Sequence, residues 1–234
     1  MTNPPKPPRR QQLRAIHTRE RILDVAGQLF VRDGYRGASL TEICTRAQAP
    51  KASLYRHFPE GKFSIAKTIM TDTLSMDGLK PQRLKLQEVV DIGMILAYRI
   101  SNEDAMEAAL KLSFENDAPE TYGTPWNDWT AFNTTQLAEA QEQGELRPFV
   151  DLAEQADQLA GCWSGMVLMS KTLDRSMSGV ERRMARFYMN FMDVVAIDDV
   201  RRQLDISTGR GSALMCAFYE ENSDESDGDG GLDE

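Results

Sequence analysis

Residues 39–58 read SLTEICTRAQAPKASLYRHF, and this stretch decides the fold. Ser39 with Glu42 three residues later forms a capping box, which predicts the start of a short helix. Pro50 disfavours helix at the residue before it and suits the first turn of a second short helix. Apolar residues recur on one side of each helix, as a buried face requires: Leu40, Ile43, Cys44 and Ala47, then Leu54 and Phe58. Two short helices across a tight turn predict a helix-turn-helix.

The motif lies in a predicted DNA-binding domain at residues 18–62. A longer helix is expected to begin at Thr18, which caps it, and to carry an apolar stripe at helical spacing: Ile22, Val25, Ala26, Leu29 and Phe30. Residues 1–17 lack periodicity and hold four prolines, which predicts a flexible basic arm. Its cations are available to DNA: Lys6, Arg9, Arg10 and Arg14.

Charge is divided unevenly along the chain. Residues 1–62 carry 12 Lys and Arg against 5 Asp and Glu, whereas residues 63–234 carry 15 against 31. Such asymmetry indicates a basic module that meets a polyanion and an acidic body held away from it. Residues 206–234 lose the helical pattern and end in an acidic run, so we expect them to form a disordered tail.

The remaining sequence predicts an all-α body at residues 63–205. A long helix is expected at 62–76, and further helices near 82–100, 104–115, 125–143, 151–174 and 180–197. No apolar run is long enough to span a membrane and the start lacks the apolar region of a secretion signal, which indicates a cytoplasmic protein. The cysteines are expected to be small buried residues: Cys44, Cys162 and Cys216. Neither they nor the two histidines have metal-ligand spacing, so we predict no metal and no cofactor.

The second short helix is predicted to enter the major groove of double-stranded DNA by its N-terminal end. Side chains that point outward there would read bases, whereas those of the preceding helix and of the next one would contact phosphates. The predicted DNA-contacting residues are Ser39, Thr41, Pro50, Lys51, Ala52, Ser53, Tyr55, Arg56, His57 and Lys62.

The same stretch resembles the helix-turn-helix signature of the TetR family of transcription regulators. The resemblance rests on Ser39, Ile43, Ala47, Leu54, Tyr55, His57 and Phe58, whereas Gln48 and Ala52 stand where many members have glycine. It implies a homodimer in which the last two long helices of each subunit form a four-helix bundle. Two wide apolar stripes support a second subunit independently: Leu152, Ala156, Leu159, Ala160, Trp163, Val167 and Leu168, and Val180, Met184, Phe187, Tyr188, Phe191, Val194 and Val195.

The body is similar to the γ-butyrolactone receptor branch of that family. The similar features are Pro125 with Trp126 and Trp129, then Gly-Glu-Leu at 144–146, then a glycine-containing apolar helix. The resemblance implies that Trp129 lines a pocket for a butyrolactone, furan or butenolide. A pocket for such a ligand needs apolar walls and few polar anchors. We predict the walls to be Trp126, Leu110, Phe114, Trp163 and Met166, and the anchors to be Gln87, Thr130 and Thr134.

The chain is therefore predicted to be a repressor that leaves a palindromic operator when its signal binds, with secondary-metabolite or antibiotic genes as its targets. Three alternatives remain open from the sequence. A pseudo-receptor or efflux regulator would share the fold but answer to an antibiotic or another hydrophobic molecule. An enzyme is disfavoured, because no catalytic triad, phosphate loop or metal spacing is present. A protein-interaction module would use the acidic tail.

Overall fold

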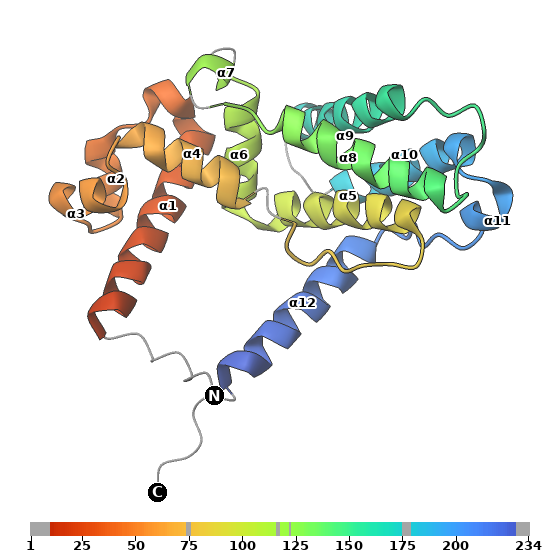
Figure 1. The fold of residues 1–234 in the computed structure, drawn as a ribbon. Helices are drawn as coiled ribbons and strands as arrows, with labels where there is room; N and C mark the ends of the chain where they lie inside the picture. The colour runs from red at the N-terminus through yellow and green to blue at the C-terminus, as the bar shows by residue number, and fades with distance from the viewer. Residues whose placement is uncertain (1–9, 74–75, 116–117, 122, 175–178, 228–234) are drawn as a thin grey trace, which may run out of the picture. The chain divides into compact units, whose positions relative to one another are not determined.

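The computed structural model describes residues 10–73, 76–115, 118–121, 123–174 and 179–227. Over these residues the fold is all-α, and the helices fall into two compact units (Figure 1). Unit 1 comprises residues 1–74 and 103–125, and unit 2 comprises 75–102 and 126–234. Unit 1 contains α1 (Arg10–Gly37), α2 (Leu40–Arg46), α3 (Lys51–His57), α4 (Lys62–Thr73), α6 (Asp104–Ser113) and α7 (Ala118–Thr121). Unit 2 contains α5 (Lys85–Asn102), α8 (Trp126–Glu142), α9 (Leu152–Asp174), α10 (Val180–Val195), α11 (Asp198–Arg201) and α12 (Arg210–Asp227).

The core of unit 1 joins the helix-turn-helix to the helices that support it. α1 packs along α6 and also contacts α2, α3 and α4. The fully buried side chains come from every one of the larger helices, among them Phe30, Ile43, Leu54, Ile65 and Leu112. This shared core fixes α2 and α3 against α1. It therefore determines which side chains of α2 and α3 point outward.

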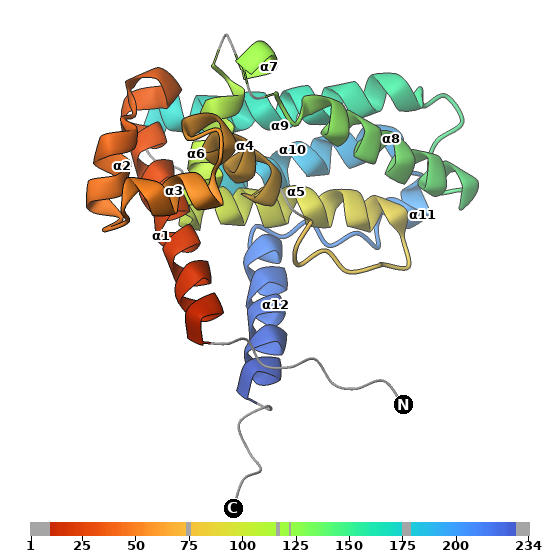
Figure 2. The same ribbon diagram turned by 60° about the vertical axis from the view of Figure 1, so that its left-hand side comes forward.

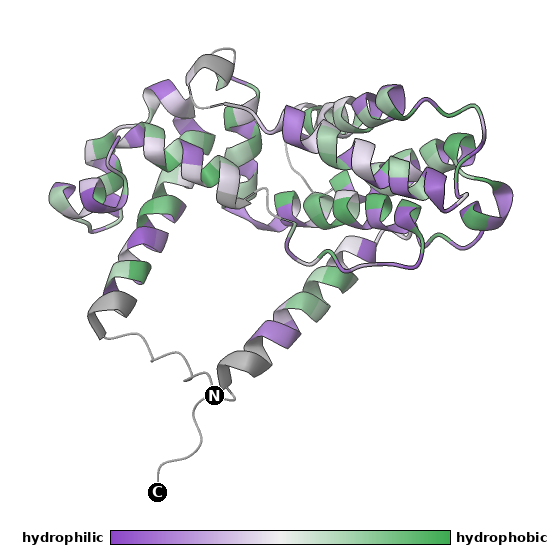
Figure 3. Ribbon diagram, viewed as in Figure 1, coloured by the Kyte–Doolittle hydropathy of each residue, from purple (hydrophilic) through white to green (hydrophobic). Residues whose placement is uncertain are grey.

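Unit 2 is built around α5, which is buried along almost its whole length. α8, α10 and α12 each pack on α5, and α9 packs on α8. α5, α8, α9 and α10 run side by side in both views, whereas α12 projects away from them (Figures 1 and 2). Hydrophobic turns recur along α5 where these neighbours cover it (Figure 3). Gly93 makes one close approach possible, because a Cβ there would lie 1.8 Å from the Tyr188 hydroxyl.

The predicted helices of the body are confirmed to within three residues at each end, but the start of α1 differs from the prediction. α1 begins at Arg10, and Thr18 lies inside it, where its hydroxyl donates to the Arg14 carbonyl oxygen at 2.7 Å. The prediction of a flexible arm is therefore wrong for residues 10–17, whereas 1–9 lie outside the described residues. This segment consists mostly of good helix formers, but its exposed Arg14, Ile16 and His17 pack on no core and leave no apolar stripe to detect.

The prediction of a disordered tail is wrong for Arg210–Asp227, which form α12. Two guanidinium nitrogens of Arg210 donate to the fully buried Asp91 carboxylate at 2.8 and 2.7 Å. Gly211 comes so close to α5 that a Cβ there would lie 2.0 Å from the Met94 carbonyl oxygen. α12 is therefore anchored by tertiary contacts with α5, which cannot be predicted from its own acidic sequence.

Two further differences concern the cysteines and α6. Cys44 is buried as predicted, but Cys162 and Cys216 are exposed, because each lies on the side of its helix away from the unit's core. α6 belongs to unit 1, although it lies in the middle of the predicted body at 63–205. That residues 18–62 bind DNA and residues 63–205 bind the ligand and form the dimer stays a prediction.

Candidate DNA-binding and ligand-binding sites

The turn between α2 and α3 is tight and requires an unusual backbone conformation. Gln48 has φ of 50°, in the left-handed region, and the Ala49 amide donates to the Cys44 carbonyl oxygen at 3.0 Å. Pro50 is the N-cap of α3, and the Leu54 amide donates to its carbonyl oxygen. Leu54 then points into the core, which turns the opposite face of α3 outward.

The predicted capping box does not form. Ser39 is the N-cap of α2 but makes no side-chain capping bond. Glu42 instead lies 3.0 Å from Arg32 and 3.8 Å from Arg46. The Ser39 side chain is exposed, as is that of Thr41, so both stay available to a phosphate.

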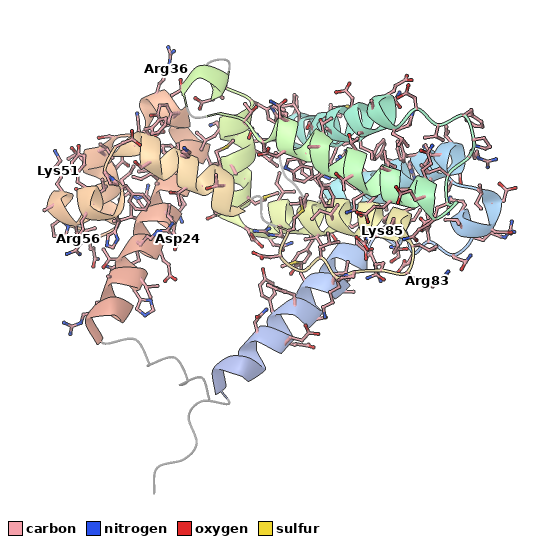
Figure 4. All side chains as sticks on the ribbon, in the orientation of Figure 1. Asp24, Arg36, Lys51, Arg56, Arg83 and Lys85 are labelled. Carbon is pink, nitrogen blue, oxygen red and sulfur yellow. The ribbon has the colours of Figure 1, made fainter. Side chains whose placement is uncertain are left out.

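The outward face of α3 gathers most of the predicted DNA contacts. Lys51, Ala52 and Arg56 are exposed, Ser53 is half-buried, and Tyr55 exposes 47% of its surface. Lys51 and Arg56 project from the helix in Figure 4. Among these side chains, the Arg56 guanidinium donates a long hydrogen bond to the Ser53 hydroxyl at 3.4 Å. This face therefore offers two cations and short side chains to an incoming duplex.

His57 does not point outward as predicted. Its side chain is half-buried, and Nε2 is enclosed without a hydrogen-bond partner in the described structure. Burial lowers the pKa of His57, and the nearby Arg56 and Arg19 lower it further. The neutral form of the His57 side chain is therefore favoured at the C-terminal end of α3.

Lys62 also differs from its predicted role as a phosphate contact. Its ammonium donates to the carbonyl oxygens of Arg36 at 3.3 Å and Ala38 at 3.0 Å, and it lies 4.7 Å from the centre of the Tyr35 ring. Burial lowers the pKa of Lys62, and Glu115 partly offsets this effect. Lys62 therefore caps the C-terminal end of α1, because its ammonium satisfies carbonyl oxygens there.

α6 holds the same end of α1 from the other side. α1 is kinked at Gly34, where φ is 73°, and the next amide, that of Tyr35, donates to Glu115 Oε1 at 2.7 Å. The Lys111 ammonium donates to the Val31 carbonyl oxygen one turn earlier. Lys111 on α6 and Glu115, two residues after its end, thus satisfy backbone groups on both sides of the kink.

In unit 2 the predicted aromatic residues come together between α8 and α9. The rings of Trp129 and Trp163 are 5.6 Å apart between centroids and inclined at 34°, and both side chains are buried. Trp163 Nε1 donates to the Gly93 carbonyl oxygen at 3.2 Å, which ties the pair to α5. The result is a buried aromatic pair in which the Trp163 N–H is already hydrogen-bonded.

The polar residues of the same face were missed at the sequence level. Asn133 and Gln136 are buried on α8, four and seven residues after Trp129, so they share its side of the helix. Gln136 Oε1 is enclosed and has no donor in the described structure. Helical spacing counted from Trp129 would have found both residues.

The three predicted anchors are placed elsewhere. Thr130 and Thr134 are half-buried on another flank of α8, and the Thr134 hydroxyl donates to the Thr130 carbonyl oxygen at 2.8 Å. Both ends of the Gln87 amide are engaged, since Nε2 donates to Asp91 at 2.6 Å and Oε1 accepts from the Asp205 amide at 2.8 Å. Gln87 therefore holds the segment before α12.

The predicted wall residues are divided between the units. Trp126 and Met166 are half-buried in unit 2. Leu110 is buried and Phe114 is 39% exposed, and both belong to unit 1. Trp129 and Trp163 are in contact with each other.

The Gly-Glu-Leu stretch at 144–146 has a structural role. Gly144 adopts φ of 73°, and the buried Glu145 carboxylate accepts from the Lys85 amide at 2.8 Å and the Leu86 amide at 2.9 Å. Leu146 forms an isolated bridge with Ala196. Glu145 thus caps the N-terminus of α5, the central helix of unit 2.

Comparison with known proteins decides the family. Residues 22–66 match the bacterial regulatory proteins of the tetR family. This match spans α2 and α3 and the parts of α1 and α4 that pack on them. The helix-turn-helix domain of this chain belongs to the TetR family. Members of this family are transcription regulators rather than enzymes.

The similarity to some relatives extends beyond the helix-turn-helix and covers most of the chain. The A-factor receptor protein of Streptomyces griseus is 29% identical over 189 residues, which are 80% of this chain and 66% of that protein. The chain therefore spans slightly less than two thirds of that receptor. The crystal structure of full-length TylP, a TetR regulator from Streptomyces fradiae, is 28% identical with a TM-score of 0.78, covering 88% of this chain and 99% of that one. A structure described as the molecular basis for control of antibiotic production by a bacterial hormone is 26% identical with a TM-score of 0.67, covering 78% and 99%.

No helix in the ranges given above is long and apolar enough to cross a membrane. Within those ranges, no three metal-ligating side chains are grouped closely enough to hold a metal ion.

Proposed function

We propose that this TetR-family chain is a cytoplasmic repressor that binds a palindromic operator as a homodimer and is released by a γ-butyrolactone-like molecule. The single observation that carries the DNA-binding part is the exposed face of α3, with Lys51 and Arg56 on a helix whose other side is buried in the core. In a dimer, two such helices placed roughly 34–36 Å apart enter successive major grooves on one side of the duplex.

The dimer is supported by an uncovered apolar face on α9. Leu168, Met169 and Leu173 expose 51%, 52% and 64% of their surfaces, beside the exposed Gly161 and the half-buried Gly165. Small residues next to large ones let two helices approach closely. Most residues of the two wide stripes predicted above are instead buried within the chain's own unit 2; Leu168 and Val194 are the exposed exceptions. A second copy covering this face of α9 completes a four-helix bundle with α10.

The ligand is supported by the buried Trp129–Trp163 pair and by the relatives. A paired aromatic surface within an apolar unit suits a lactone, furan or butenolide with an alkyl chain. The relative that is an A-factor receptor and the one described with a bacterial hormone and antibiotic production favour a signal of this class and target genes for secondary metabolites. Release requires that the ligand bind better when α4 has moved, since only differential affinity shifts the equilibrium.

A gel-shift titration with duplexes taken from beside the chain's own gene tests the DNA part. We expect salt-sensitive binding to one palindromic duplex and its loss in an Arg56→Ala variant. Leu173→Arg should produce monomers in sedimentation and weaken operator binding, whereas the exposed Phe149→Arg serves as a control elsewhere in unit 2. Binding without salt dependence, or to no duplex, would contradict the proposal.

Adding lactones to the bound operator tests the ligand part. A butyrolactone, furan or butenolide should dissociate the wild-type complex, and Trp129→Ala should keep operator binding while losing this response. Release only by an antibiotic would instead support the pseudo-receptor or efflux-regulator alternative.

A further inference from the structure

The exposed surface of α9 and α10 carries opposite charges at its two ends. Asp157 is exposed near the start of α9, and Arg182 and Arg186 are exposed near the start of α10. The two helices are consecutive and lie side by side, and Arg183 Nη1 donates to the Ser170 hydroxyl at 2.8 Å. This bond brings the end of α9 to the start of α10, so the helices run antiparallel. The acid and the two bases therefore lie at opposite ends of the surface.

These three charges are not explained by contacts within the chain. Asp157, Arg182 and Arg186 form no ion pair or side-chain hydrogen bond with another described residue. Arg182 and Arg186 are four residues apart on one helix, a spacing at which like charges destabilise the helix. Arg182 also lies in the first turn, where the helix dipole disfavours a cation. A negative charge from outside the chain would offset both effects.

Gly161 and Gly165 lie on α9 between the charged ends. A Cβ at either position would meet nothing within 4 Å, so the packing of the chain itself does not require glycine there. Glycine inside a helix is less stable than alanine. Two helices approach more closely where side chains are small. Both glycines therefore fit a point at which a helix of another molecule crosses α9.

The spacing of the charges places a two-fold axis beside these glycines. Asp157 lies 13 residues before Ser170, or roughly 20 Å along α9, and Arg186 lies three residues, or roughly 5 Å, beyond Arg183. The opposite charges are thus about 15 Å apart along the helices, and their midpoint falls about five residues after Asp157, at Cys162. Half a turn about an axis through this point brings the acidic end of one copy onto the basic end of another.

We propose, resting on the homodimer proposed above, that Asp157 of each subunit pairs with Arg182 and Arg186 of the partner subunit across an axis at Cys162. The contact is self-complementary, because each subunit supplies both the acid and the bases. It stabilises only the antiparallel approach of the two α9 helices, since a parallel approach sets like charges against each other. These charges therefore make the face specific for a second copy of this chain in one orientation, which the apolar residues of α9 alone do not achieve.

Charge reversal tests the pairing. In sedimentation of the full-length protein at about 0.1 M salt, Asp157→Arg and Arg186→Glu should each raise the dimer dissociation constant about 30-fold or more, with a smaller effect at about 0.5 M. An equimolar mixture of the two variants should form a dimer within about fivefold of the wild-type constant, because the acid and the base have exchanged places in one set of pairs. The exposed Glu142→Arg on α8 should leave the constant unchanged.

Cross-linking tests the position of the axis. A short bismaleimide reagent should join the two copies of Cys162 in the dimer. Both Cys162 and Cys216 are exposed, so Cys162→Ser should abolish the cross-linked species whereas Cys216→Ser should not.

The outcomes separate this inference from the function on which it rests. A dimer that neither reversal weakens, or variants that stay weak when mixed, overturns the pairing and leaves the proposed repressor dimer standing. A dimer that gives no cross-link through Cys162 overturns the placement of the axis. A monomeric wild type overturns both the inference and the proposed dimer.

Discussion

Lys51 and Lys62 are two lysines of the same small unit for which the structure predicts opposite consequences of the same substitution. Lys51 is exposed at the start of α3 and has no partner among the described residues. Lys62 is bonded to two carbonyl oxygens and lies over an aromatic ring. Replacing each by Met keeps most of the side chain's volume and removes only the charge and its hydrogen bonds.

For Lys51→Met the expected change is in DNA binding. Each phosphate contact contributes about 0.9 to the slope of log K against log salt, so a dimer that loses two contacts should lose about 1.8. That difference corresponds to roughly 60-fold in affinity at about 0.1 M salt and roughly 4-fold at about 0.5 M. Fluorescence anisotropy with the operator duplex over this range measures the slope, and thermal melting should be unchanged.

For Lys62→Met the expected change is in stability. Two charge-assisted hydrogen bonds and one cation–π contact, at a half-buried position, together account for about 3 kcal/mol. In a chain of this size the melting temperature should fall by roughly 6–12 °C, while the salt slope of the folded protein stays that of the wild type. The reasoning is refuted if Lys62→Met lowers the salt slope without changing stability, or if Lys51→Met leaves the slope intact.

Three further predictions concern stability. Glu145→Ala leaves two amides at the start of α5 without acceptors and should lower the free energy of unfolding by about 3 kcal/mol in urea titration, whereas the exposed Glu142→Ala should change it little. Gln48→Gly relieves a left-handed residue and should raise that free energy by about 1 kcal/mol; a decrease would mean that the turn differs in solution. Since the folded pKa of His57 is lowered, its contribution to stability is present above the ordinary value near 6.5 and is lost as the pH falls toward the folded pKa. Unfolding followed from pH 7.5 to 5 should therefore show a shallower decline for His57→Phe but not for His17→Asn.

The helix-turn-helix could be predicted because its signals are local. Pro50, the apolar spacing of α2 and α3, and the outward side chains of α3 depend on residues within one or two turns of each other. The hydrogen bonds of Lys62 could not be predicted from local signals, because its partners lie at the end of α1, more than 20 residues earlier in the sequence. His57 was placed outward by its residue type, although its position on α3 turns it toward the core.

The body shows the same division. Its helices follow from apolar periodicity, and the Trp129–Trp163 contact joins two residues that were predicted for one pocket. α12 was missed because it is anchored to Asp91, which is 119 residues from Arg210 in sequence. The anchors were chosen by residue type, and the structure places Thr130 and Thr134 on a half-buried flank of α8 rather than on the buried side that holds Trp129.

The route of the chain through α6 has a mechanical consequence. The backbone passes from unit 1 to unit 2 before α5, returns for α6 and α7, and leaves again before α8. α6 is thus connected to unit 2 along the chain in both directions. Lys111 on α6 and Glu115, just after its end, are hydrogen-bonded to the backbone on either side of the bend in α1. Any change in the position of α6 therefore acts on the bend of α1, the helix against which α2 and α3 pack.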